Sequence, residues 1–472
     1  MPHATSYELA VIGSGPGGVA AALAGARRGL RVALIERGEV GGVCLNVGCI
    51  PTKALVAVAH LARGIRHAAA FGLRVGAPEV DYPAILARNA RIISVLRTGL
   101  TDLLRRERVE LVAGEAAFES PRRLRMTCDG ASRALEADRF VLATGASPSP
   151  GPWVFDEARV LSYRGLLALP ALPASLLIIG GGVIGCEFAS LLNALGTSVT
   201  IVEQQAALLP GEDPDASRWL TRRLEADGVV VRAGTTVQRL EPTADRVRAE
   251  LADGTRCEAE RALIAVGLRP NVERLGLEAA GVVQHAAVQV DATLRTSQPH
   301  IAAIGDCLGG HGLAHWASAE GARAVRHLLG DPPSPVDPAE VPRCIFTDPE
   351  VARIGPLEAE LDGRARAIRL SFAALGKSHC EGDPEGFVKL LVEPSTDRVL
   401  GATIVGPQAS SLIHVAVLAV THGLTAKQLA RTITAHPTLP EGITEAAAHL
   451  YGESLVMAAR PSARAPRGIG AP

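Results

Sequence analysis

Short apolar runs and glycine-rich turns alternate along the N-terminal part of the chain. Residues 9–12 are apolar, Gly-Ser-Gly-Pro-Gly-Gly follows at 13–18, and an alanine-rich helical pattern covers 19–28. A second strand-like run, residues 31–35, ends in Glu36. Strand, G-x-G-x-x-G, helix, strand and acidic residue together form the fingerprint of a dinucleotide-binding βαβ unit.

The three glycines and the glutamate of this unit have separate predicted roles. Gly13 makes the tight turn, Gly15 lets the backbone approach a pyrophosphate, and Gly18 lets the helix and strand pack closely. The pyrophosphate is expected at the positive N-terminus of the helix. Glu36 is expected to accept hydrogen bonds from the ribose hydroxyls.

The same pattern occurs a second time. Residues 176–179 are apolar, glycines follow at 180–185, a helix is expected from about 186 to 195, and residues 198–202 lead to Glu203. In both copies the acidic residue stands 18 positions after the last glycine. An internal repeat of this kind predicts two separate dinucleotide sites in one chain.

Glu203 predicts which nicotinamide nucleotide the second site prefers. A carboxylate there binds the free ribose hydroxyls of NAD and repels the extra phosphate of NADP, for which an arginine would be expected. Two glutamines follow Glu203, and the sequence has no cationic cluster nearby. We therefore expect NAD. The residues assigned to this site are Gly180, Gly182, Gly185 and Glu203.

Each Rossmann-like copy is closed by a later apolar run that ends in glycine. Residues 140–145 end in Thr144 and Gly145, and residues 262–267 end in Gly267. Both turns resemble strand-end motifs of the flavoprotein family to which the strings described below also point, and this resemblance implies that they lie beside the flavin and nicotinamide sites.

The composition changes after a proline-rich stretch at 331–342. Residues 386–392 and 399–405 have the pattern of two strands in one antiparallel sheet, and 409–422 has a helical pattern. The predicted fold class is therefore α/β, with two Rossmann-like dinucleotide-binding domains and a C-terminal α+β domain.

Composition narrows the possible partners. The chain has 472 residues, of which 47% are hydrophobic and 21% charged, and its formal net charge is −1. This balance gives no support to nucleic acid or an anionic membrane as the main partner. We find no apolar run of transmembrane length and no signal-peptide pattern, and we expect a cytoplasmic protein with no metal site.

Residues 41–53, GGVCLNVGCIPTK, carry the strongest candidate chemistry. Cys44 and Cys49 stand five apart, too far for a disulfide in a regular helix, which rises ~1.5 Å per residue. A disulfide between them would need an irregular backbone around Gly48 and would place Cys49 near a helix N-terminus, which stabilises a thiolate. The alternative is two small buried thiols. The six other cysteines are scattered and do not form a disulfide framework.

This string resembles the redox-active motif of the flavin-dependent pyridine nucleotide-disulfide oxidoreductases. The Leu-Asn-Val-Gly-Cys-Ile-Pro version is most similar to the dihydrolipoamide dehydrogenase branch. Further similar strings are TSQPHIAAIGD at 296–306, LAHWASAEG at 313–321 and AHPTLPE at 435–441. The resemblance covers nearly the whole chain, and its motifs stand in the family's order.

The resemblance implies roles for the cysteines and the cofactors. FAD is expected in the first nucleotide site and NAD in the second, with Cys44 as the interchange thiol and Cys49 as the flavin-side thiol. Further residues expected beside the flavin are Asp306 on the ribityl chain, Ala314 near the ring, and Lys53 near flavin N5 in an ion pair with Glu187.

His436 and Glu441 form a second predicted constellation. In the family the matching pair is the acid/base, and it reaches the cysteines of the other subunit, so the resemblance implies a homodimer. Two positions depart from the pattern, because Thr434 stands where a histidine is common and Pro440 where a serine is usual. Both lie near the channel expected for the disulfide substrate, so the identity of the dithiol stays open.

The implied activity is oxidation of protein-bound dihydrolipoyl groups through Cys44 and Cys49, with transfer to FAD and then, as hydride, to NAD. The expected partner is a lipoyl-bearing carrier protein or a complex of the 2-oxo acid dehydrogenase or glycine cleavage type. One alternative is an NAD(P)H-dependent, glutathione-reductase-like enzyme, which would favour an arginine near position 203. A mercuric reductase would need a later cysteine pair than Cys380, and a non-catalytic subunit would be expected to lack Cys44, Cys49 or His436.

The resemblance and the proline-rich linkers suggest five segments. Residues 1–148 are the first part of the FAD domain, 149–271 the NAD domain, 272–342 the second, central part of the FAD domain, 343–455 the interface domain and 456–472 a flexible tail.

Overall fold

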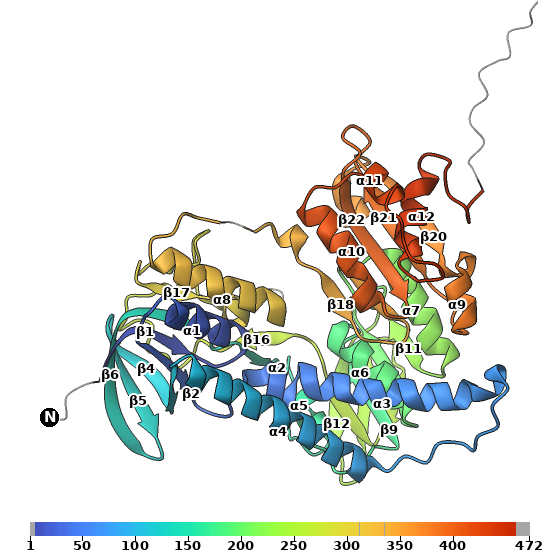
Figure 1. Cartoon of the computed structure of the whole chain (residues 1–472). Coiled ribbons are helices and arrows are strands. Elements are labelled where there is room, and N and C mark those ends of the chain that lie inside the picture. Colours follow the sequence, from blue (N-terminus) through green and yellow to red (C-terminus); the bar gives the residue numbers. More distant parts are fainter. Residues whose placement is uncertain (1–4, 311, 335, 459–472) are drawn as a thin grey trace, which may run out of the picture.

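The computed structural model describes residues 5–310, 312–334 and 336–458. Figure 1 shows three units. One parallel sheet with its helices lies on one side, a second parallel sheet lies beside it, and the C-terminal antiparallel sheet stands above the second. The predicted tail lies mostly outside the described residues.

The first unit is built on a seven-stranded sheet in the order β3-β2-β1-β6-β5-β4, and β17 also pairs with β6. The strands β3, β2, β1, β6 and β17 run parallel, whereas β4 and β5 continue the sheet as an antiparallel extension that the sequence did not predict. The strands are β1 (Thr5–Ile12), β2 (Val32–Glu36), β3 (Glu110–Ala113), β4 (Glu115–Ser120), β5 (Arg123–Cys128), β6 (Ala131–Leu142) and β17 (Ile301–Ala303).

Helices α1 (Pro16–Arg27) and α8 (Ala314–Leu328) pack closely against each other in this unit (Figure 1). A Cβ added to Gly321 of α8 would lie 2.3 Å from the carbonyl oxygen of Gly17 in α1. The close approach of the two backbones therefore requires glycine at position 321.

The second unit repeats the parallel plan in the order β11-β10-β9-β15-β8. A separate three-stranded antiparallel sheet, β12-β13-β14, adjoins it, and β7 pairs with β16 between the units. The strands are β7 (Ala146–Pro148), β8 (Val160–Leu161), β9 (Ser175–Ile179), β10 (Ser198–Glu203), β11 (Val230–Ala233), β12 (Val237–Pro242), β13 (Val247–Leu251), β14 (Arg256–Ala259), β15 (Arg261–Ile264) and β16 (Leu268–Pro270), and the helices are α5 (Tyr163–Leu167), α6 (Val183–Ala194) and α7 (Pro214–Ala226).

Both nucleotide-site helices begin about three residues before the predicted start. Gly15 caps α1 and Gly182 caps α6, so the last glycine of each loop lies inside the first turn of the helix. Pro16 suits the first helical position, where its missing N–H leaves no hydrogen bond unmade.

The C-terminal unit is a five-stranded antiparallel sheet in the order β18-β19-β22-β21-β20. The two predicted strands form its adjacent pair β21 and β22, and the predicted helix is α10. The elements are β18 (Arg343–Ile345), β19 (Glu350–Ile354), β20 (Arg366–Ser371), β21 (Phe387–Val392), β22 (Val399–Gly406), α9 (Gly376–Cys380), α10 (Ala409–Thr421), α11 (Ala426–Ala430) and α12 (Glu441–His449).

The long helix α3 (Cys49–His67) lies across the molecule beside α4 (Tyr82–Arg106), and the short α2 (Gly42–Val47) precedes it (Figure 1). The 3-10 helices are η1 (Ala68–Phe71), η2 (Gly305–Leu308), η3 (Pro338–Glu340), η4 (Glu358–Leu361) and η5 (Phe372–Ala374).

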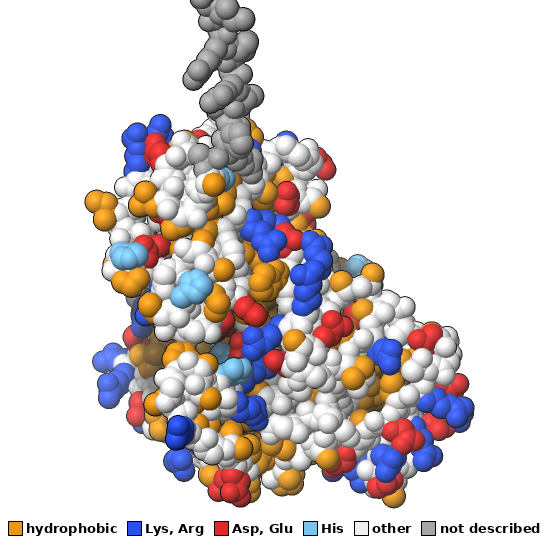
Figure 2. All heavy atoms as spheres, turned by 90° about the vertical axis from the view of Figure 1, so that its right-hand side faces the viewer, with side chains coloured by type: hydrophobic (Ala, Val, Ile, Leu, Met, Phe, Trp, Pro, Cys, Tyr) orange, Lys and Arg blue, Asp and Glu red, His pale blue; other side chains and the backbone are white. Residues whose placement is uncertain are grey.

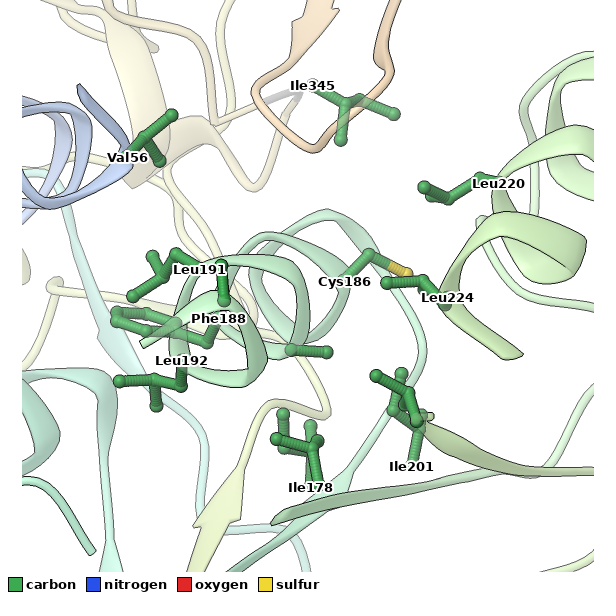
Figure 3. Close-up of a cluster of buried hydrophobic side chains, with 14 of the residues drawn as sticks. Val56, Ile178, Cys186, Phe188, Leu191, Leu192, Ile201, Leu220, Leu224 and Ile345 are labelled. Atoms are coloured by element: carbon green, nitrogen blue, oxygen red, sulfur yellow. The ribbon is translucent and has the colours of Figure 1, made fainter. Parts of the chain in front are cut away.

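Helix α6 lies at the centre of the largest apolar core. Figure 3 shows Val56 of α3, Leu220 and Leu224 of α7 and Ile345 of β18 around the apolar side chains of this helix. The core therefore joins residues from all three units, and its close packing contributes to holding their relative positions.

Arg63 of α3 ties the same units together by charge. Its guanidinium lies 3.0 Å from Asp227, which follows α7, and 2.7 Å from Asp348 of the C-terminal unit. Arg63 also donates to the carbonyl oxygen of Ser190 in α6 (3.2 Å). Burial alone would raise the pKa of Asp348, but the charge and hydrogen bond of Arg63 bring the net pKa below its usual range.

One expectation about membranes is corrected by the helices. By length and composition alone, the helical segment Gly42–Phe71 could cross a membrane, with a mean hydropathy of 1.6. Core helices pass the same test. This segment breaks at Gly48, and its Lys53 and Arg63 pair with carboxylates of the other units, so we interpret it as a helix that joins the units of the folded chain.

Charges of both signs are interspersed on the face shown in Figure 2. This mixture fits the formal net charge of −1 for the whole chain.

We predict that replacing Arg63 by methionine destabilises the fold by about 3 kcal/mol, because Asp348 loses the cation that contacts it and Asp227 keeps only its contact with Arg223. Urea unfolding at matched FAD content measures the effect. The control is Arg27→Met, whose ion pair with Glu107 is exposed, so no measurable change is expected. Equal unfolding midpoints for Arg63→Met and the wild type would refute the proposed clamp.

Candidate active site

The cysteine pair lies at a break between two helices. Cys44 is in α2, which ends at Val47, and Cys49 is the first residue of α3. Between them Gly48 has φ −137° and ψ −105°, a conformation outside the helix. This is the irregular backbone that the spacing requires. Both side chains are half-buried free thiols in this structure.

The two thiols differ in their tendency to ionise. A hydrogen bond from the Cys44 thiol and the charge of Lys53 lower the pKa of Cys49 to about 7, although burial opposes the shift. The pKa of Cys44 is raised by the same hydrogen bond, by burial and by the charge of Cys49. Of the two thiols, Cys49 therefore ionises more readily, and the N-terminus of α3 also favours a thiolate at this position.

Lys53 stands one helical turn after Cys49 and forms the predicted ion pair with Glu187. Their charged atoms are 2.7 Å apart, and Glu187 is buried in α6. The ion pair thus connects the cysteine helix to the helix of the second nucleotide site.

The first nucleotide loop has the geometry needed to bind a pyrophosphate. Gly13 has φ +103°, and an added Cβ would lie 2.3 Å from the carbonyl oxygen of Ala143. An added Cβ at Gly18 would lie 1.8 Å from the carbonyl oxygen of Gly13. At Gly15 an added Cβ would meet nothing within 4 Å, so this position opens onto free space at the N-terminus of α1. The residues present therefore fit a dinucleotide such as FAD.

The second loop repeats this geometry. Gly180 has φ +108° and would place a Cβ 2.4 Å from the carbonyl oxygen of Ala265, and a Cβ at Gly185 would lie 2.0 Å from the carbonyl oxygen of Gly180. An added Cβ at Gly182 again meets nothing within 4 Å. The repeat inferred from sequence is therefore also a repeat in backbone geometry, and the second loop fits NAD in the same way.

The acidic residue of each copy supports its own glycine loop. Glu36 accepts hydrogen bonds from the backbone N–H groups of Ser14 (3.0 Å) and Gly38 (2.8 Å). Glu203, which is buried, accepts from the backbone N–H groups of Gly181 (2.6 Å) and Gln205 (2.7 Å). A carboxylate held in this way is fixed at the strand end, where the ribose of a bound nucleotide would lie.

Four predicted site residues follow the ends of parallel strands. Thr144 and Gly145 follow β6, Gly267 follows β15, and Asp306 follows β17. Thr144 donates to the carbonyl oxygen of Asn271 (2.7 Å), while Gly145 and Gly267 have φ +69° and +125°. Burial raises the pKa of Asp306, and its charge also acts on Cys44, so Asp306 lies on the cysteine side. Ala314 begins α8, so its backbone stands at a helix N-terminus.

His436 and Glu441 form the predicted pair. His436 Nδ1 lies 2.8 Å from Glu441 Oε1, and Glu441 Oε2 accepts from the backbone N–H of Thr438 (2.6 Å). The histidine side chain is 76% exposed. Among the described residues, the side-chain hydrogen bonds of His436 and Glu441 are to each other and to Thr438, and none joins them to Cys44 or Cys49.

Sequence reasoning missed Ser14 and Phe346. Ser14 is fully buried, donates its hydroxyl to Glu36 (2.7 Å) and accepts from the backbone N–H of Gly41 (3.1 Å), which docks the cysteine segment on the first glycine loop. Phe346 contacts both Lys53 and Glu187. Ser14 could have been suspected from its place inside the glycine motif, whereas Phe346 is far from both contacts in sequence.

Two family models match the chain. The model described as pyridine nucleotide-disulphide oxidoreductase matches residues 7–321, and the dimerisation domain of the same family matches residues 341–447. These matches confirm the predicted fold class, and the dimerisation domain supports the predicted homodimer.

Curated relatives are similar over nearly their whole length. Proteins named dihydrolipoyl dehydrogenase from Chlamydia muridarum and Bacillus subtilis are each 38% identical to this chain, over 94% and 93% of it and over 96% and 97% of their own length.

Solved structures agree with this result. The crystal structure of LpdA from Mycobacterium tuberculosis is 33% identical, with a TM-score of 0.88 over 94% of this chain and 99% of that chain. The Cu(II) complex of the HOCl-induced flavoprotein disulfide reductase RclA from Escherichia coli is 28% identical, with a TM-score of 0.85 over 94% of this chain and 99% of that chain.

We predict that Gly15→Ala leaves the fold intact and lowers FAD binding, because its Cβ projects into the space open to the pyrophosphate. Gly18→Ala is the matched comparison, and we expect it to destabilise the first unit because its Cβ overlaps the carbonyl oxygen of Gly13. Flavin content per chain and thermal unfolding of the purified variants measure the two effects. Full flavin content in Gly15→Ala would argue against this loop as the pyrophosphate site.

Proposed function

The chain belongs to the pyridine nucleotide-disulphide oxidoreductase family, and we propose that it oxidises dihydrolipoyl groups with NAD as the acceptor. The observation that carries the proposal is the cysteine pair at the start of α3, whose two thiols have opposite pKa shifts. The names of the similar curated relatives support the choice of substrate. Its cofactors are FAD and NAD.

The proposed reaction begins with the Cys44–Cys49 disulfide. A thiolate of the dihydrolipoyl substrate attacks Cys44 Sγ, a mixed disulfide forms, and Cys49 leaves as a thiolate. The lowered pKa of Cys49 suits it to leave without a proton. The second substrate thiolate then attacks the substrate sulfur of the mixed disulfide, which closes the lipoyl disulfide and releases Cys44. When bound, FAD supplies the two-electron redox chemistry between the cysteine dithiol and NAD.

The raised pKa of Cys44 explains the need for a proton carrier. Because Cys44 is a poor thiolate, it departs best when a proton reaches it, and each substrate thiol must also lose a proton before it attacks. Glu441 accepts from His436 Nδ1 and leaves Nε2 free to carry these protons. We assign the acid/base role to His436 of one subunit acting on the cysteines of its partner.

The preference for NAD rests on Glu203. Its buried carboxylate is held by two backbone N–H groups and lies beside the second glycine loop. The additional phosphate of NADP would be repelled by the Glu203 carboxylate, which stands where an arginine would be needed to bind it. NADP should therefore bind more weakly than NAD.

We propose a cytoplasmic location, a compartment in which disulfides are usually transient and catalytic, as proposed for Cys44 and Cys49. The expected partner is a lipoyl-bearing carrier or a complex of the 2-oxo acid dehydrogenase or glycine cleavage type. We also propose domain boundaries near residues 148, 271 and 342. Strands before and after each of these positions belong to different sheets, which supports the boundaries.

A second candidate is the reduction of a different disulfide. The likeness to RclA, an HOCl-induced flavoprotein disulfide reductase, favours this possibility. The departures from the family's pattern at Thr434 and Pro440 also stand close to His436 in the sequence. They could therefore select a different disulfide substrate. Both candidates use the same cysteines, so the substrate decides between them.

We predict rapid NADH formation when purified, FAD-loaded protein is mixed with dihydrolipoamide and NAD. Cys44→Ser should abolish turnover, because the substrate sulfur then has no disulfide to attack, while the FAD content stays unchanged. NADPH with oxidised glutathione, run in parallel, should give little turnover. Oxidation of NADPH by glutathione without any reaction of dihydrolipoamide would overturn both the substrate and the nucleotide preference.

A further inference from the structure

Phe346 stands where the C-terminal unit meets the redox site. It follows β18, and its backbone N–H donates to Glu187 Oε1 (2.9 Å). Lys53 Nζ lies 4.6 Å from the centre of the phenylalanine ring and 2.7 Å from Glu187 Oε2. One residue of the C-terminal unit therefore contacts both members of an ion pair formed by the other two units.

The ring contributes an attraction that the ion pair alone does not supply. A cation over the face of an aromatic ring is stabilised by the ring's quadrupole, and the effect is larger away from bulk water. The Lys53 side chain is 32% exposed, so its flexible stem could otherwise turn the ammonium toward solvent. Contact with the Phe346 ring limits that freedom.

The position of the ammonium matters for Cys49. Lys53 stands four positions after Cys49 on α3, so both side chains project from the same face of the helix. The groups that act on Cys49 are Cys44, Lys53 and Glu187. Lys53 favours the thiolate and Glu187 opposes it, so the balance depends on how close the ammonium remains.

We propose that Phe346 is a positioning residue that holds the Lys53 ammonium between Glu187 and Cys49, so that the seating of the C-terminal unit sets how readily Cys49 ionises. The proposal rests on the proposed function only in taking Cys49 as the thiol that must ionise. It assigns to the dimerisation domain a second task beside the presentation of His436.

The test measures ionisation of Cys49 without any substrate. In full-length, FAD-loaded protein carrying Cys44→Ser, the serine hydroxyl keeps a donor beside Cys49. The rate of Cys49 alkylation by iodoacetamide is followed against pH by mass spectrometry of the Cys49 peptide. We expect Phe346→Leu to move the midpoint to higher pH and to slow alkylation at neutral pH roughly threefold, because the ammonium spends less time near the thiolate.

Two further variants separate this role from a general loosening of the site. Phe346→Tyr keeps the ring and should restore the wild-type profile. In a Lys53→Met background, Phe346→Leu should cause no additional change, since no ammonium remains to be held. An unchanged midpoint in Phe346→Leu, or an equal shift with and without Lys53, would overturn the proposal.

This readout is independent of the substrate. If dihydrolipoamide proves inactive but Phe346→Leu shifts the alkylation profile, the proposed function fails and the role of Phe346 stands. The reverse outcome rejects the role of Phe346 alone.

Discussion

The ion pair between Lys53 and Glu187 is the contact on which the arrangement of the redox site depends. It joins α3 to α6, and Phe346 of the C-terminal unit closes over it. Ten residues further along α3, about 15 Å at the helical rise, Arg63 makes a second set of ionic contacts to the same two units. Charges buried in this way are weak evidence for added stability, because their desolvation offsets much of their attraction. These ion pairs instead favour one position of α3, since any other position of the helix would leave a buried charge without its partner.

The same helix explains why the cysteines differ. Because the helices break at Gly48, Cys49 is the first residue of α3, where the helix N-terminus and Lys53 both favour a thiolate. Cys44 lies in α2, and its raised pKa favours the protonated thiol. Ser14 binds the segment before Cys44 to the first glycine loop. The nucleotide loop and the reactive thiols are therefore held together by the same hydrogen bonds. The different roles of the two thiols follow from this geometry.

Local rules predicted much of this structure. Gly13 and Gly180 adopt positive φ, and added Cβ atoms at Gly18 and Gly185 would overlap the loop backbone, as the motif requires. The helix starts were misplaced because the last glycine of each motif belongs to the first helical turn.

Contacts between distant residues could not be predicted from spacing. Phe346 and Glu187 are 159 positions apart, and nothing in the sequence distinguishes the buried Arg63 from the exposed Arg66 a few residues later. The pairing of Lys53 with Glu187 was implied only by family resemblance. The proposed contact of His436 with the cysteines of a second subunit was likewise implied only by family resemblance, because no pattern within one chain describes it.

The account requires that each active site combine cysteines of one subunit with His436 of the other. The most direct test mixes inactive Cys44→Ser dimers with inactive His436→Gln dimers under conditions of subunit exchange. Random exchange makes half of the dimers mixed, each with one complete site, so activity should return to about a quarter of the wild-type value. Full loss of activity in the exchanged sample, with mixed dimers verified by mass, would contradict a site shared between subunits.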